Sequence, residues 1–127
     1  MTIRSLIIES SGDSIWYQKS KFKGSDTVSG DSFSRTGIDI SSDGLTCVIG
    51  ARRDDNSGGT DAGSIYIFTY SAGTWNQQAR LQASDAASSD FFGNEVSISS
   101  DGNTVAVGSY LDDNASGTDA GAVYVFT

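Results

Sequence analysis

The sequence predicts an all-β fold made of two repeated antiparallel units, and the main reason is that the chain repeats itself once. Segments 38–50 and 60–68 recur at an offset of 58 residues, and segment 16–26 recurs at an offset of 59. One extra residue near 35–37 accounts for the difference. A fixed period near sixty residues indicates supersecondary units that bury their apolar faces against one another.

The second observation is the strand pattern, because no segment keeps a helical period while several alternate or run apolar for four or five residues. We expect four strands in each unit. A short Ser-Asp-Gly hairpin separates the first two, and its glycine accepts positive φ without steric cost. The expected strands are 37–41 and 95–99 (first), 46–50 and 104–108 (second), 64–68 and 122–126 (third), and 16–23 and 75–82 (fourth).

The distribution of apolar residues over these strands predicts β-propeller blades. The second and third strands are apolar on both faces, so both faces should be covered. The fourth strand carries Gln77, Gln78 and Arg80 and should be the wet outer strand. A meander of this kind is typical of a propeller blade, and Gly50 and Gly108 allow a neighbouring sheet to approach. An aligned β-sandwich is the alternative, although the strict repeat favours radial stacking.

The strand count predicts how the units are organised and assembled. Unit 1 covers residues 5–63 and unit 2 covers residues 64–127. A third-type strand at 5–9 and an outer strand at 16–23 precede the first full blade, whereas the last blade lacks an outer strand. Two blades cannot close a ring, so we expect a homo-oligomer, with a trimer giving six blades favoured, or further repeats of a longer chain.

Composition narrows the class of protein. Sixteen acidic residues against eight basic ones give a net charge of −8, which argues against a nucleic-acid partner. Histidine, the commonest general base, is absent, and the sequence shows no nucleophile–base pair or phosphate-binding loop. We therefore expect that the protein is not an enzyme. Cys47 aligns with Val105 and should be a buried small hydrophobe. The lysines of the first outer strand should share one solvated face: Lys19, Lys21 and Lys23.

The second repeat carries a recognisable motif series, with Asp90-Phe-Phe-Gly93 followed by Val96-Ser-Ile-Ser99 and Gly121-Ala-Val-Tyr-Val-Phe126. It resembles the bacterial FG-GAP-type repeat, a relative of the repeats of the integrin α-chain β-propeller. The first repeat departs from the pattern with Phe33-Ser34. The resemblance covers the chain from about Ser5 and implies a non-enzymatic adhesion or recognition module.

We expect such a module to act at a cell or virion surface, on a protein or glycan partner. The first ten residues lack the long apolar run of a signal peptide, and no segment is apolar enough to span a membrane. The sequence therefore predicts an extracellular or surface location reached without a leader or anchor in this chain.

The resemblance also implies a possible calcium site, because integrin-type repeats hold calcium in the hairpin between the first two strands. In this chain the two hairpins, residues 41–44 and 99–102, contain one carboxylate each. Calcium prefers six to eight oxygen ligands, so we expect no calcium in these hairpins. The long loops contain weak candidates instead, but their spacing does not fit the alternating calcium-loop pattern, and Asx turns explain the same residues. These candidates are Asp54, Asp55, Asp61, Asp112, Asp113 and Asp119.

A glycan-binding lectin with sites between the blades is the alternative function. Trp16 and Trp75 occupy equivalent positions, where they could serve as sugar platforms or as packing residues at the blade edge. Arg52 and Tyr110 occupy one repeat position but differ in type, so either could contact a ligand. No catalytic residue is predicted.

Overall fold

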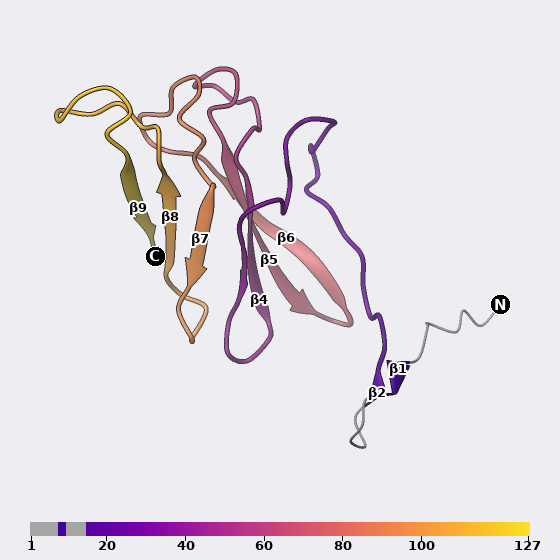
Figure 1. The fold of residues 1–127 in the computed structure, drawn as a ribbon. Coiled ribbons are helices and arrows are strands. Elements are labelled where there is room, and N and C mark those ends of the chain that lie inside the picture. Colours follow the sequence, from indigo (N-terminus) through magenta and orange to yellow (C-terminus); the bar gives the residue numbers. More distant parts are fainter. Residues whose placement is uncertain (1–7, 10–14) are drawn as a thin grey trace.

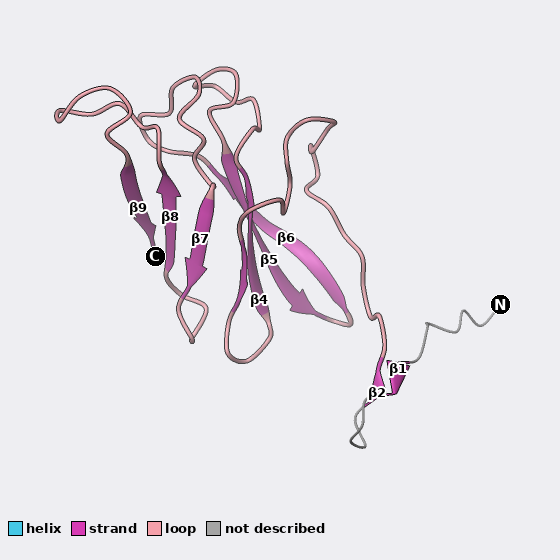
Figure 2. Cartoon of the chain, in the orientation of Figure 1, coloured by secondary structure: helices cyan, strands magenta, loops and turns pink. Residues whose placement is uncertain are grey.

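The computed structural model describes residues 8–9 and 15–127, which form strands, turns and loops (Figures 1 and 2). No helix that could cross a membrane occurs in this part of the chain. The strands are β1 (Ile8–Glu9), β2 (Ile15–Trp16), β3 (Ile38–Ile40), β4 (Thr46–Ala51), β5 (Ser64–Ser71), β6 (Thr74–Leu81), β7 (Glu95–Ile98), β8 (Val105–Ser109) and β9 (Ala122–Phe126).

Two antiparallel sheets correspond to the predicted blades. Blade 1 has the order β3-β4-β5-β6, and blade 2 has the order β7-β8-β9. The meander and the all-β class are confirmed, with the predicted strand limits shifted by a few residues at most. A bulge between Ile67 and Phe68 interrupts the pairing of β5 with β6. In Figure 1 the two sheets stand beside each other, with blade 2 on the left.

The predicted hairpin turns between the first two strands of each blade are also confirmed. Gly44 and Gly102 have φ values of 73° and 76°, the left-handed conformation that glycine adopts at no steric cost. The Asp43 carboxylate accepts hydrogen bonds from Ser41 Oγ and from the Leu45 amide, at 2.6 and 2.9 Å. These bonds lower the pKa of Asp43 because they stabilise its charged form.

The prediction of a full outer strand at 16–23 is wrong. Only Trp16 of this range is in a strand, β2, which pairs with β1, and residues 17–23 run extended beside blade 1 (Figure 1). Its predicted neighbour is the strand at 5–9, and the described pairing between the two segments is limited to Ile8 with Trp16 and Glu9 with Ile15. The Phe22 ring packs on Phe68 with 4.6 Å between centroids. Of the strand predicted at 5–9, residues 5–7 lie outside the described residues.

One hydrophobic core lies between the blades, and a second, which includes Tyr66 and Phe68, lies within blade 1. Val48 and Ile65 of blade 1 face Val105 and Val107 of blade 2. Ala83 and Phe92, on the connection from β6 to β7, fill the space between these two faces. The Phe92 ring meets Tyr124 and Phe126 edge-on, at 5.4 and 6.0 Å between centroids. Each blade therefore depends on the other for burial of the apolar residues on the face between them.

Close approach between the blades requires glycine at position 50. A Cβ added to Gly50 would lie 2.0 Å from the carbonyl oxygen of Gly93, and one added to Gly63 would lie 2.0 Å from that of Phe92. The expected close approach at Gly50 is thus confirmed. Its counterpart Gly108 differs, because the nearest atom to an added Cβ is Glu95 Cβ at 3.7 Å.

The prediction that both faces of the third strand are covered holds for β5 but not for β9. Val123 and Val125 on β9 are 71% and 63% exposed, whereas their counterparts Ile65 and Ile67 are fully and partly buried. The difference follows from position: blade 2 covers this face of blade 1, and no described residue covers the same face of blade 2. The predicted burial of Cys47 is confirmed at 5% exposure.

We expect Gly50→Ala to lower the free energy of unfolding by about 1–3 kcal/mol, because the methyl group would overlap the Gly93 backbone. Gly108→Ala is the matched control and should change it by less than about 0.5 kcal/mol. Urea denaturation at a protein concentration low enough for the monomer provides the measurement. Equal losses for the two variants would contradict the packing argument.

Candidate functional site

Each blade carries a tyrosine–carboxylate cluster at the same place in the repeat. In blade 1 the Tyr66 hydroxyl, on β5, donates to Asp26 Oδ1 at 2.7 Å. Arg80, on the outer strand β6, forms ion pairs with Asp54 and Asp26, the latter at 3.2 Å. Its Nε also donates to the Tyr66 oxygen at 3.3 Å. We call these residues, Asp26, Asp54, Tyr66 and Arg80, the blade 1 cluster.

The blade 1 cluster is neutralised where it is most buried. Asp54 is only 4% exposed, and it accepts a 2.5 Å hydrogen bond from Ser64 Oγ in addition to its ion pair with Arg80. Burial raises the pKa of Tyr66, and the hydrogen bond to Asp26 adds to this effect. A buried carboxylate of this kind is stable only when a cation and hydrogen bonds compensate its lost hydration.

The blade 2 cluster consists of Asp85, Asp112 and Tyr124. The Tyr124 hydroxyl lies 2.7 Å from Asp85 Oδ1 and 2.8 Å from Asp112 Oδ1. A hydroxyl carries one proton, so it can donate to only one of these carboxylates at a time. Both ion pairs found among the described residues belong to Arg80, and neither reaches this cluster. Ala122 stands where blade 1 has Ser64, so the serine hydroxyl is missing as well.

The blade 2 cluster is therefore strongly negative. Asp112 is 2% exposed, and Asn114 Nδ2 lies 3.5 Å from its Oδ2 atom. Burial raises the pKa of the nearby Asp90, and the charges of Asp112, Asp113 and Asp85 raise it further. Burial likewise raises the pKa of Tyr124, together with its hydrogen bonds to Asp85 and Asp112. Both clusters hold two carboxylates beside a tyrosine hydroxyl, and among the described residues a cationic side chain reaches only the one in blade 1.

The long loops use most of the predicted calcium candidates as turn residues. Asp55 Oδ1 accepts from the Asp61 amide at 2.9 Å, and Asp113 Oδ1 accepts from the Asp119 amide at 2.8 Å. Asp54 and Asp112 belong to the clusters described above. Within the described residues, no group of three or more acidic, cysteine or histidine side chains is arranged to hold a metal ion. Weak calcium binding by these loops stays a prediction.

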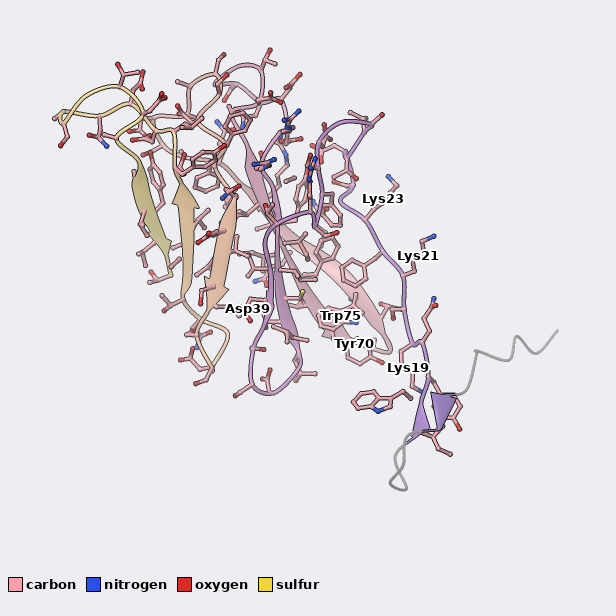
Figure 3. All side chains as sticks on the ribbon, viewed as in Figure 1. Lys19, Lys21, Lys23, Asp39, Tyr70 and Trp75 are labelled. Carbon is pink, nitrogen blue, oxygen red and sulfur yellow. The ribbon has the colours of Figure 1, made fainter. Side chains whose placement is uncertain are left out.

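The two tryptophans of the lectin hypothesis lie apart from each other and from Arg52 and Tyr110. Trp75 is half-buried on blade 1, with its ring 5.7 Å from that of Phe22 and 5.5 Å from that of Tyr70 (Figure 3). Trp16 is 71% exposed, on the β1–β2 hairpin that projects from the blades.

Arg52 and Tyr110 do come together, because both contact the ring of Phe91. The Arg52 guanidinium lies 5.6 Å from the centre of the Phe91 ring, and the Tyr110 ring stacks on Phe91 at 5.8 Å. The Arg52 side chain also donates to Asn94 Oδ1 at 3.1 Å. The sequence hypothesis omitted Phe91, although its signal was available: it replaces Ser32 at a position where the repeats differ, just as Arg52 and Tyr110 differ.

The sequence analysis also missed the clusters. The signal was present, because the tyrosine and both carboxylates recur at the repeat offsets. A repeat shows which residues are equivalent, but it does not show which distant segments meet. Only the fold brings the connection after an outer strand, the long loop and the third strand to one point.

We expect Arg80→Met to lower the free energy of unfolding by about 2–4 kcal/mol, because it leaves the buried Asp54 carboxylate without its cation. Combining it with Asp54→Asn should recover most of that loss, since the uncompensated charge is then gone. A double-mutant cycle measured by urea denaturation tests this. Additive losses from the two substitutions would show that the ion pair contributes no coupling.

For calcium we expect the thermal midpoint to rise by less than about 1 °C between chelator and millimolar calcium. The loop carboxylates already accept backbone amides, and their spacing suits turns better than a calcium shell. Differential scanning fluorimetry with and without chelator provides the measurement. A rise of several degrees that Asp112→Ala removes would establish a calcium site.

Comparison with known proteins agrees with the internal repeat. The model of the FG-GAP repeat matches residues 16–68 and 75–126. Each matched segment begins at an outer-strand position and ends in the third strand of the following blade, so it contains one whole tyrosine–carboxylate cluster except the cation. No curated protein matches the sequence. On the two matched segments, which cover most of its length, the chain belongs to the FG-GAP repeat family.

Proposed function

We propose that this chain is a non-enzymatic structural and recognition module, a building block for a β-propeller at a cell or virion surface. The observation that carries the proposal is the junction between the two blades. There the apolar faces are buried, and the surfaces that correspond to them on the outer sides of both blades are exposed. A module of this form is suited to lateral stacking against further repeats.

The chemistry of the carboxylates supports a structural role over catalysis. Asp31 and Asp90 bind the backbone amides of Val28 and Ala87, at 2.7 and 2.8 Å, and so close tight turns. Asp54 is held by Arg80, and Asp43 caps a hairpin. Side chains fixed in this way stabilise the loops instead of presenting a reactive group to a substrate.

A location at a surface is consistent with the composition and the family. The net charge of −8 and the Ser-, Gly- and Asp-rich loops favour a well-hydrated exterior that resists non-specific association. FG-GAP repeats are typical of proteins that act outside cells, where they contact other proteins or glycans.

The lectin alternative is favoured by one observation, the exposed ring of Tyr110. It is 48% exposed, rests on Phe91, and borders a hollow of about 450 Å³ that Asn94 and Glu95 also line. An aromatic face beside polar groups is a suitable platform for a sugar. Glycan-array binding lost in Tyr110→Ala, but kept in the control Tyr70→Ala, would select this function.

For the structural function we expect the chain to form a closed assembly, with three copies and six blades favoured. Multi-angle light scattering should then give three times the chain mass of 13.3 kDa. Association buries the exposed apolar faces, so the assembly should dissociate on dilution. A folded monomer that persists up to about 100 μM, where even weak specific contacts are populated, would contradict self-assembly.

A further inference from the structure

We propose that the free edge of blade 2 binds residues 16–34 of a second copy of this chain, and that Lys21 of that copy supplies the cation that the blade 2 cluster lacks. The inference rests on the proposed function of self-assembly and names the surface and the residues that perform it. It follows from the contact between blade 1 and blade 2 inside the chain, which we call the inner junction. Each of the two surfaces that meet there has a repeat counterpart on the outside of the other blade.

The junction inside the chain is the template. Residues 75–93 provide the outer strand of blade 1 and the connection that packs on its face. The counterparts of residues 75–93 are residues 16–34, at an offset of 59. Residues 75–93 pack on the surface formed by residues 46–68, and the counterpart of that surface is residues 104–126, at an offset of 58. The described residues thus include both a donor segment and a matching acceptor surface.

The acceptor edge is a strand with one free side. In blade 1, β6 pairs with β5 in the register Ile65↔Leu81 and Tyr66↔Arg80. In blade 2, β9 has β8 on one edge and no strand on the other within the described residues. An unpaired edge offers its amides and carbonyls to a further strand. The same register would place Phe22 of the second copy opposite Val123, and Lys21 opposite Tyr124.

Within the chain the donor segment contacts blade 1 through Phe22, whose ring packs on Phe68 and Trp75. Residues 17–23 run extended but belong to no strand of the described structure, and they end in the projecting β1–β2 hairpin (Figure 1). Lys19, Lys21 and Lys23 point away from β6 in Figure 3. None of the three takes part in an ion pair among the described residues. The lysine heads are therefore directed away from blade 1.

Charge selects Lys21 among them. Its counterpart Arg80 neutralises the blade 1 cluster, whereas Lys19 and Lys23 correspond to Gln78 and Gln82. The blade 2 cluster has a 2% exposed carboxylate, Asp112, and a tyrosine proton that can serve only one of two carboxylates. A lysine ammonium is a compact charge with three donors, and it could bind Asp112 directly.

The apolar surfaces also match. Val123 and Val125 are exposed on blade 2, and their counterparts Ile65 and Ile67 belong to the buried core of the inner junction. On the far side of blade 1, Ile38 and Ile40 are 62% and 51% exposed, and their counterparts Val96 and Ile98 pack against that same core. The two exposed faces are therefore the two sides of one core.

The backbone conformations that the junction requires are already formed on both outer surfaces. Inside the chain, the Phe91 amide donates to the Asp61 carbonyl and the Phe92 amide to the Ala62 carbonyl, at 3.2 and 3.0 Å. Phe91 and Asp61 have φ values of 55° and 54°. Their counterparts Ser32 and Asp119 have φ values of 61° and 52°. Such strained conformations for non-glycine residues fit a surface formed for contact.

The hollow beside Gly108 completes the fit. Its lining includes Gly108, Tyr110, Gly121 and Val123. Gly108 corresponds to Gly50, against which the Gly93 carbonyl packs inside the chain. The counterpart of Gly93 is Ser34, so the backbone of Ser34 from the second copy would occupy this hollow.

The two junctions differ in several polar contacts, because Ser57, Arg52 and Asp39 of the inner junction correspond to Ala115, Tyr110 and Ser97. Asp39 Oδ2 accepts from the Ile98 amide at 2.8 Å across the inner junction. The counterpart of Asp39 is Ser97, which has no carboxylate. We therefore expect the junction between copies to be weaker than the junction within the chain.

The first test isolates the charge. In sedimentation equilibrium, Lys21→Gln should raise the dissociation constant of the assembly at least about tenfold, the usual loss when a charged hydrogen bond is removed. Lys21→Arg should restore binding, because arginine occupies this position inside the chain. Lys19→Gln and Lys23→Gln are the matched controls and should change the constant less than about twofold. Equal weakening by all three glutamine variants, or none by Lys21→Gln, overturns the assignment of Lys21.

The second test isolates the surface. Val123→Lys and Gly108→Ala should each weaken association more than about a hundredfold, since interface cores tolerate neither a buried charge nor a backbone overlap. Both sites are open in the single chain, so circular dichroism should show an intact fold. Val28→Lys is the control, because Val28 is 72% exposed and its counterpart Ala87 is exposed as well.

The outcomes separate this inference from the function on which it rests. A wild-type chain that stays monomeric contradicts both. An assembly that forms but is unaffected by Lys21→Gln, Val123→Lys and Gly108→Ala leaves the structural function standing and overturns this surface. An assembly sensitive to the two surface variants but not to Lys21→Gln keeps the edge and removes the lysine.

Discussion

The rest of the structure depends on backbone contact between neighbouring blades. Gly50 and Gly63 have no side chain, so the segment around Phe92 and Gly93 can lie directly on blade 1. The amide of Phe92 then bonds to Ala62, and its ring reaches the core of blade 2. A core formed in this way belongs to two blades at once, which explains how a chain of modest apolar content can bury its strands.

The tyrosine–carboxylate cluster links the polar part of the fold to the same arrangement. Arg80 comes from the outer strand, Asp54 from the long loop and Tyr66 from the third strand, so the cluster forms only when all three are in place. The outer strand thus carries both a sheet edge and a cation. A blade without its outer strand loses both, and blade 2 shows the consequence at Asp112 and Tyr124.

Much of the fold could be predicted because short sequence patterns determine its strands and turns. The hairpin glycines, the apolar strands and the repeat offsets identify the blades, and Cys47 is recognisable as buried from its alignment with Val105. The failures concern strand neighbours, which the sequence pattern does not identify. Residues 17–23 have the pattern of an outer strand but form no strand of either blade, and β9 has the pattern of a covered strand although no described residue covers one of its faces. The clusters were missed because periodicity does not give distances between segments.

The segments matched by the family model do not have the same boundaries as the blades, and this affects the free energy of the contact between blades. The second matched segment begins in β6, the outer strand of blade 1, and continues through blade 2, so the chain itself crosses the inner junction. That crossing makes the inner contact intramolecular and holds its two halves at high effective concentration. A contact between copies has no such link and must overcome the loss of translational and rotational freedom. In a closed ring the last contact again becomes intramolecular, so closure favours a complete ring over open chains of the same module.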